Sequence, residues 1–221
     1  AAYTDAAKAD LTYPDFSAVD GLNIVGDAAQ VEDQLRITPA QEATAGAVWA
    51  TTKQLIEVGF TTTFGVQLSD FGGLVNPLDG ADGADGFTFA IQNSSVSALG
   101  AIGHSIGYMG VENSLVIEFD TWQNDYDPSG NHVSVQTAGL GPNHANHDYS
   151  LGASSEIPNL SDGAVHVIRI DYVSGSVSVY IDDPNTPRLV VPVDLATTLA
   201  LDNGRAWVGF TSATGDAWEN H

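Results

Sequence analysis

The sequence predicts an all-β domain folded as an antiparallel β-sandwich. Short runs rich in β-branched and aromatic residues recur along the chain, separated by Gly, Asp, Asn and Pro, while helical periodicity is almost absent. The length of 221 residues is enough for one sizeable core, and sandwiches of this length are commonly single domains. We therefore expect one domain over residues 11–221, preceded by an Ala-rich tail over residues 1–10.

Ten strands are predicted, and one pair forms a clear hairpin. Residues 166–172 and 177–181 lie on either side of Ser174 and Gly175, and each run alternates apolar with polar side chains. One face of the hairpin should therefore pack in the core, and the other should be exposed to solvent. Only a short helical turn is expected, around residues 193–201. The predicted strands are 34–38, 46–49, 59–67, 86–91, 115–120, 132–136, 165–173, 176–182, 189–193 and 206–212.

The charge excludes several classes of partner. The chain has six basic and 28 acidic residues, which gives a formal net charge of -22. It should therefore repel a phosphate backbone and an anionic membrane surface. We find neither an apolar run near 18 residues nor a basic-then-apolar start, so we expect no membrane span and no signal peptide within the sequence. The acidity and the lack of cysteine suit a cation-rich environment. We therefore predict an extracellular or cell-surface location in a bacterium.

The segment 118–132 concentrates side chains that bind metals. It places four carboxylates, three carboxamides and an imidazole directly after the apolar run 115–117. Unpaired carboxylates are costly beside a buried strand, so we favour a metal site over a solvated acidic strand end. In an extended chain alternate side chains share a face, which predicts that four of them point the same way: Glu118, Asp120, Trp122 and Asn124.

The types of ligand in this segment suit two different ions. Calcium takes oxygen ligands from carboxylates, carboxamides and carbonyls, whereas manganese or zinc also accepts an imidazole nitrogen. The calcium set is Asp120, Asn124, Asp127 and the Trp122 carbonyl, and the second set is Glu118 and His132 with Asp120 and Asp127 shared. We interpret two further histidines, His144 and His147, as part of a solvated polar loop.

Several sequence blocks carry a resemblance that runs over nearly the whole chain. In order, they are residues 13–16 (YPDF), 59–64 (GFTTTF), 84–91 (ADGFTFAI), 110–115 (GVENSL), the metal segment, and 207–215 (WVGFTSATG). The sequence is similar to the legume-type (L-type) lectins. This resemblance implies a concanavalin A-like jelly roll with a curved front sheet, a flatter back sheet, and a carbohydrate site on loops at the concave face.

The resemblance also implies roles for particular residues. Glu118, Asp120, Asp127 and His132 match the ligands of the family's transition-metal site, usually manganese, and Asp120, Asn124, Asp127 and the Trp122 carbonyl match those of calcium. Asp85 matches the sugar-binding aspartate, which follows a cis peptide bond held by calcium through bound water. Loss of the metal is therefore expected to abolish sugar binding.

The implied sugar site uses a carboxylate and several donors. Asp85 accepts hydrogen bonds from two adjacent hydroxyls, the Asn124 amide donates to one of them, and a backbone N–H donates as well. Gly103 matches the family at that last position, with the His104 N–H as a second candidate. The short loop 213–218 offers Gly215 and Asp216 as specificity residues. Two roles stay open for Trp122, namely stacking on a sugar ring and packing as a core aromatic.

Two other function classes compete with a lectin. A glycoside hydrolase on the same architecture needs a second glutamate, which would fall at Trp122 or Gln123, so we expect a binder and no enzyme. A structural adhesion module without sugar binding is the other alternative, and the joint presence of Asp85, Gly103 and Asn124 argues against it.

The family pattern also bears on the end of the sequence. It implies a final apolar strand after residues 219–221, where this sequence stops. Either the sequence is truncated before this strand, or another segment or subunit fills its place. If nothing fills it, we expect an open sheet edge that pairs two copies into a homodimer.

Overall fold

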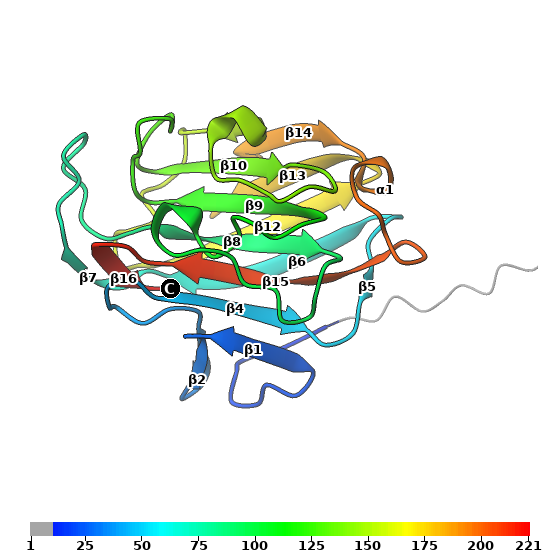
Figure 1. The fold of residues 1–221 in the computed structure, drawn as a ribbon, viewed down its shortest axis with the longest axis horizontal. Helices are drawn as coiled ribbons and strands as arrows, with labels where there is room; N and C mark the ends of the chain where they lie inside the picture. The colour runs from blue at the N-terminus through cyan, green and yellow to red at the C-terminus, as the bar shows by residue number, and fades with distance from the viewer. Residues whose placement is uncertain (1–10) are drawn as a thin grey trace, which may run out of the picture.

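The computed structural model describes residues 11–221 and shows two antiparallel sheets packed face to face, as predicted (Figure 1). The prediction for residues 1–10 lies outside the described residues. In spatial order, the front sheet contains β1 (Leu22–Gly26), β4 (Ala45–Ala50), β15 (Arg205–Ala213), β8 (Gly86–Gln92), β9 (Ser114–Asp120), β10 (His132–Thr137) and β11 (Ser150–Ser154), and β5 (Gln54–Leu55) pairs with β15. The back sheet contains β14 (Leu189–Val193), β13 (Gly175–Ile181), β12 (Val165–Val173) and β6 (Phe60–Gln67).

Smaller elements complete the fold at its margins. Two-stranded ribbons join β2 (Ala29–Val31) to β3 (Gln34–Arg36) and β7 (Ser69–Gly73) to β16 (Ala217–Asn220). Helical structure among the described residues amounts to single turns, namely α1 (Leu195–Thr198) and the 3₁₀ turns η1 (Gly103–Ser105) and η2 (His147–Tyr149). None of these helices is long and apolar enough to cross a membrane.

The predicted hairpin is confirmed. Val173 pairs with Ser176 at the end of the β12–β13 ladder, so the chain turns at Ser174 and Gly175. Gly175 has a φ of 94°, a conformation that glycine adopts without steric cost. Buried and more exposed positions alternate along β12. The fully buried side chains of Ile168 and Ile170 face the front sheet. The hairpin therefore contributes six buried residues to the main core.

Two apolar cores cover the two faces of the front sheet. The main core lies between the sheets and includes the stacked rings of Phe87 and Phe119, whose centroids are 4.7 Å apart. A second core lies on the outer face, where Ile106 and Tyr108 from the loop after η1 pack against Trp49. Consequently all seven residues of β9 are buried. Any polar side chain that β9 places on its outer face is therefore enclosed rather than solvated.

The last residues form part of the fold. Ala217–Asn220 form β16 and pair with β7, and the backbones of Ile37 and Thr38 hydrogen-bond with that of His221. These residues are thus a strand in their own right. Within the described residues β6 and β14 are the edge strands of the back sheet, and the homodimer stays a prediction.

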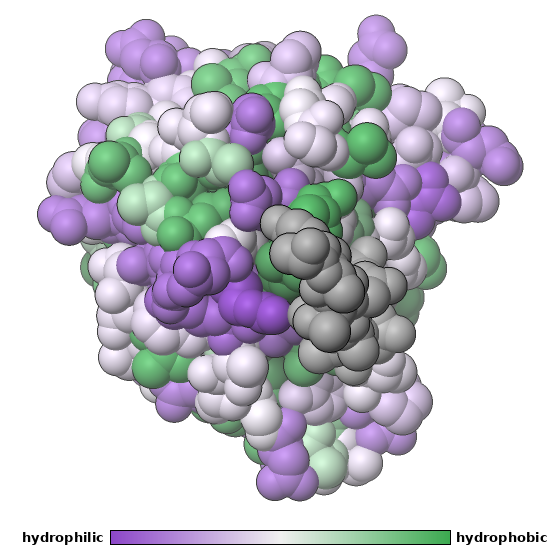
Figure 2. Space-filling view, turned by 90° about the vertical axis from the view of Figure 1, so that its right-hand side faces the viewer, coloured by the Kyte–Doolittle hydropathy of each residue, from purple (hydrophilic) through white to green (hydrophobic). Residues whose placement is uncertain are grey.

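The surface at one end of the sandwich is mixed in character. Figure 2 shows the end that carries α1 and β5, where hydrophilic and hydrophobic side chains form small neighbouring patches. β9 ends at Asp120 and β10 begins at His132. These two strand ends lie at the opposite end of the front sheet (Figure 1).

Candidate metal and carbohydrate site

Strand register brings three predicted ligands together. On β9 and β10, His132 lies opposite Asp120 and Ser134 lies opposite Glu118. Alternate residues of a strand share a face, so the side chains of these residues all project from the outer face of the front sheet. All of them are buried, with Glu118 only 1% exposed. The prediction that Glu118 and Asp120 share a face is confirmed.

Hydrogen bonds fix the Glu118 carboxylate. The Tyr108 hydroxyl donates to its Oε2, while Ser134 Oγ at 2.9 Å and Gln136 Nε2 at 3.3 Å donate to Oε1. Burial opposes ionisation of Glu118, but contacts with His132, Tyr108 and Ser134 outweigh it and hold the pKa below its usual value. Glu118 is thus a preorganised anion. Sequence reasoning missed Tyr108, which reaches the site from the loop after η1.

The chain turns directly after Asp120, and this corrects one prediction. β9 ends at Asp120, whose Oδ1 accepts from the Trp122 N–H at 2.8 Å. Asp127 Oδ2 then accepts from the Asn124 N–H at 2.7 Å, and the Asp127 N–H donates to the Asn124 carbonyl. The extended-chain argument is therefore wrong for Trp122 and Asn124, because carboxylates that cap backbone amides bend the chain into a loop. The turn instead brings Asp127 to within 4.8 Å of Asp120 and His132.

The electrostatics of this cluster call for a cation. Burial raises the pKa of Asp120 well above its usual value, and the nearby charges of Glu118 and Asp127 raise it further. Burial likewise raises the pKa of Asp127 to about 6. Carboxylates held this closely are stabilised together by a divalent ion, and the donor set of carboxylate oxygens with an imidazole fits such an ion. The residues present therefore suit the metal that the sequence predicts.

The structure places His147 in the same cluster. Its Nε2 lies 2.9 Å from His132 Nε2 and 3.7 Å from Asp127 Oδ1. The interpretation of His147 as part of a solvated loop was therefore wrong, because η2 turns the side chain inward. His144 agrees better with that interpretation, since its ring stacks on the exposed Tyr149 instead of joining the cluster.

Asp85 lies beside this cluster in a second buried position. The Ala84–Asp85 peptide bond is cis, and the Asp85 backbone is tied to Ala213 and Thr121 by hydrogen bonds. The Asp85 side chain is 4% exposed, and within residues 11–221 its Oδ2 has no hydrogen-bond partner. Burial raises the pKa of Asp85 to about 8, with a further contribution from the charge of Glu219.

Two glycines leave space in front of the Asp85 carboxylate. A Cβ atom added to Gly215 would lie 3.4 Å from Asp85 Oδ2 and 3.5 Å from the Cα of Gly103. The chain thus brings Asp85, Gly103 and Gly215 together from three separate loops. The Gly103 N–H itself donates to the Thr214 carbonyl at 3.0 Å.

The remaining predicted site residues lie around this position. His104 is exposed and packs edge-on against the Tyr126 ring, with centroids 6.4 Å apart. Asp216 is also exposed, and its charge contributes to raising the Asp85 pKa. Trp122 and Asn124 are half-buried, and both roles of the Trp122 ring stay predictions.

Comparison with known proteins identifies the family. The family model described as the legume lectin beta-barrel domain matches residues 14–221. The chain belongs to the legume lectin family. Among solved structures, a lectin from Bauhinia forficata in complex with GalNAc superposes with a TM-score of 0.72 at 21% identity, covering 94% of this chain and 91% of that one.

Two further structures extend the comparison of folds. The Ca²⁺/Man-bound exoplasmic/lumenal domain of VIP36 gives a TM-score of 0.72 at 14% identity, covering 93% of this chain and 81% of that one. The metal-free lectin I-B4 from Griffonia simplicifolia gives 0.71 at 18% identity, covering 95% and 97%. At these identities the likeness establishes the shared fold.

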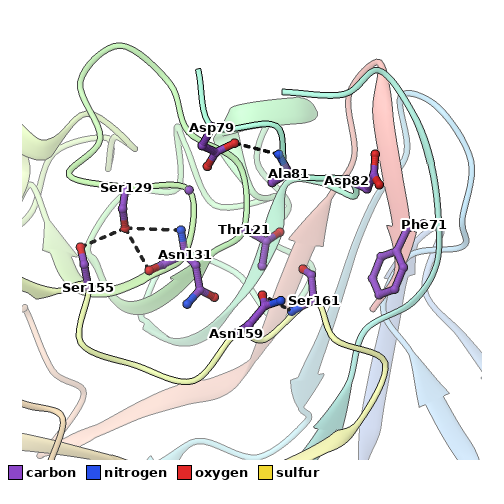
Figure 3. A pocket seen from close by; sticks show the side chains of 11 residues that line it. Phe71, Asp79, Ala81, Asp82, Thr121, Ser129, Asn131, Ser155, Asn159 and Ser161 are labelled. Carbon is purple, nitrogen blue, oxygen red and sulfur yellow. Dashed lines mark hydrogen bonds between the residues drawn. The ribbon is translucent and has the colours of Figure 1, made fainter. Parts of the chain in front are cut away.

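This lectin domain also has a cavity that the sequence did not predict. It has a volume of about 480 Å³ and lies between the loops around Asp79, Gly130 and Asn159 (Figure 3). None of the residues predicted for sugar binding lines it. Two of its lining hydroxyls, those of Thr121 and Ser161, donate to the fully buried Glu219. The cavity wall thus fixes the carboxylate whose charge raises the pKa of Asp85.

Proposed function

We propose that this domain binds glycans through Asp85, in a site that calcium organises. The observation that carries the proposal is the buried Asp85 Oδ2, which makes no hydrogen bond within residues 11–221 and faces the space left by Gly215. Buried polar atoms are almost always hydrogen-bonded, so this oxygen suits a donor that the described residues do not supply. Adjacent hydroxyls of a sugar supply such donors in the required pairs.

The protein donors to the sugar are the next part of the proposal. The Asn124 side-chain amide donates to a sugar hydroxyl, and a backbone N–H donates to another. Because the Gly103 N–H is engaged with Thr214, this second role falls to the His104 N–H. Gly103 and Gly215 act by leaving room for the ring, and Asp216 borders the site from the exposed side.

The metal ligands follow from the donor types. Calcium is bound by Asp120, Asn124, Asp127 and the Trp122 carbonyl, which are all oxygen donors. A second divalent ion, manganese or a similar metal, is bound by Glu118, Asp120, Asp127 and His132. The positive charge neutralises this carboxylate cluster and favours the ionised Asp85, whose hydrogen-bond acceptors the sugar needs.

The geometry favours a binder over a glycoside hydrolase. A hydrolase needs two carboxyl groups that reach the glycosidic bond from either side. Glu118 is 1% exposed and accepts hydrogen bonds from Tyr108, Ser134 and Gln136, so it is inaccessible to a substrate. A purely structural module gives no reason for a buried carboxylate whose Oδ2 makes no hydrogen bond within residues 11–221 and faces the space beside Gly215.

The solved relatives support carbohydrate binding as the class of activity. One is in complex with GalNAc and another is in a mannose-bound form with calcium, so the fold accommodates different sugars. We further propose that the domain works outside the cell in adhesion or surface recognition, where divalent ions and salt relieve its charge of -22.

A pair of variants tests the proposal. We expect Asp85→Asn to lose glycan binding while retaining calcium, because Asp85 contacts the sugar and not the ion. We expect Asp127→Asn to lose both, because it removes a shared metal ligand. Binding is measured on immobilised glycans, and calcium by calorimetric titration. Full glycan binding by the Asp85→Asn variant would refute the proposed site.

A further inference from the structure

His147 reaches the cluster of proposed metal ligands from outside the segment that defines it. It begins the 3₁₀ turn η2, which the Asn146 side chain caps by accepting from the Asp148 N–H at 2.8 Å. The imidazole is turned inward, with only 16% of its side chain exposed. Its ring centroid lies 4.8 Å from that of His132. The turn therefore holds the side chain in place beside His132.

The two imidazoles present nitrogen atoms to one another. His132 Nδ1 lies 2.8 Å from the Ser129 carbonyl oxygen, an atom that only accepts hydrogen bonds, so Nδ1 carries the proton. In the neutral ring, which is the form that binds metals, His132 Nε2 then presents its lone pair, and His147 Nε2 lies only 2.9 Å from it. Either a proton or a metal ion must lie close to both nitrogens to make this approach favourable.

The surrounding atoms favour a metal ion. Glu118 Oε1 lies 3.8 Å from His132 Nε2, and Asp127 Oδ1 lies 3.7 Å from His147 Nε2. One ligand atom from each of Glu118, His132 and His147 falls within a span of 4.8 Å. Two nitrogens bound to one ion at about 2.1 Å and at right angles are roughly 3.0 Å apart. The observed separation of 2.9 Å is close to that spacing and also to the length of a hydrogen bond, so the two neighbouring carboxylates are what favour the ion.

We propose that His147 is an additional protein ligand of the second divalent ion, so that two imidazoles bind it together with carboxylates. This inference rests on the metal cluster of the proposed function and deepens it. Imidazole binds zinc, copper, iron and nickel well, whereas manganese is typically bound by carboxylate, carbonyl and water. The second imidazole therefore shifts the preference of the site from manganese towards zinc and neighbouring late first-row ions.

Competition between metals tests this ligand. Zn²⁺ and Mn²⁺ dissociation constants are measured by competition with a chromophoric chelator, with calcium present in excess. We expect His147→Ala to weaken Zn²⁺ binding by about 10- to 100-fold and Mn²⁺ binding by less. In the Co²⁺-loaded protein the same change should alter the visible absorption bands, because one nitrogen ligand is lost. The matched control is His144→Asn, in the same loop but outside the cluster, which removes the imidazole but keeps an acceptor for the Asn146 N–H and should leave both constants unchanged.

The possible results separate this inference from the function on which it rests. Unchanged Zn²⁺ affinity and unchanged Co²⁺ bands in the His147 variant would overturn it and indicate a plain hydrogen bond between the two rings. Equal losses in the His144 variant would also overturn it. Calcium-dependent glycan binding is measured on the unmodified chain, so the proposed function stands or falls by a different readout.

Discussion

The hydroxyl of Tyr108 offers a sharp test of how the metal cluster is built. Tyr108→Phe keeps the ring in the outer core and removes the hydroxyl that donates to Glu118 Oε2 and lies 3.5 Å from the His144 carbonyl oxygen. Tyr108 and Glu118 are each 1% exposed, so water cannot replace the lost hydrogen bond. A hydrogen bond to a charged group contributes about 1.5–3 kcal/mol, and we expect the free energy of unfolding to fall by that amount.

Thermal and urea denaturation measure this loss directly. For a chain of this size 1 kcal/mol corresponds to roughly 2–4 °C, so the melting temperature should fall by about 3–12 °C, with an unchanged dependence on urea. Tyr149→Phe is the matched control, because Tyr149 is 40% exposed and its loss of a hydroxyl should have little effect. A shift below about 1 °C for Tyr108→Phe would refute the view that this hydroxyl holds the Glu118 carboxylate.

Two further predictions concern Asp85. In the metal-free protein the pKa of Asp85 is raised to about 8, so between about pH 4 and 8 the folded chain holds a proton that the unfolded chain has released. The free energy of unfolding should therefore fall as the pH rises through this range, by up to about 1.4 kcal/mol per pH unit. Urea unfolding across that range measures the slope, and the same slope in Asp85→Asn would contradict this cause. Gly215→Ala should weaken glycan binding about tenfold, or about 1.4 kcal/mol, because its Cβ would lie 3.4 Å from Asp85 Oδ2. Binding equal to the unmodified chain would show that the sugar does not approach Gly215.

The sequence predicted the strands whose residues alternate or are strongly apolar. β12 and β14 have the predicted bounds, and β9 differs by one residue. The strands that were missed include β7 and β11, whose segments SDFGG and SLGAS are rich in Ser and Gly and lack a β-branched run. Such segments become strands because a partner supplies the ladder, which for β11 is the preceding strand β10. For β7 it is β16 at the other end of the chain.

The same division holds for the site. Glu118, Asp120, Asp127 and His132 could be predicted because they lie within one short segment, and the structure brings them together. Tyr108 and His147 lie outside that segment and carry no local signal, so only the tertiary fold shows their contacts. The error for Trp122 and Asn124 arose because alternation was extended past the point where the Asp120 side chain caps the backbone.

Glycan binding with and without calcium tests the central claim most directly. The unmodified chain is applied to a glycan array in calcium, after removal of metal by a chelator and dialysis, and again after calcium is restored. We predict binding to a defined set of glycans that disappears with the metal and returns with it. Binding that persists after verified metal removal, or no binding to any glycan in calcium, would contradict the account.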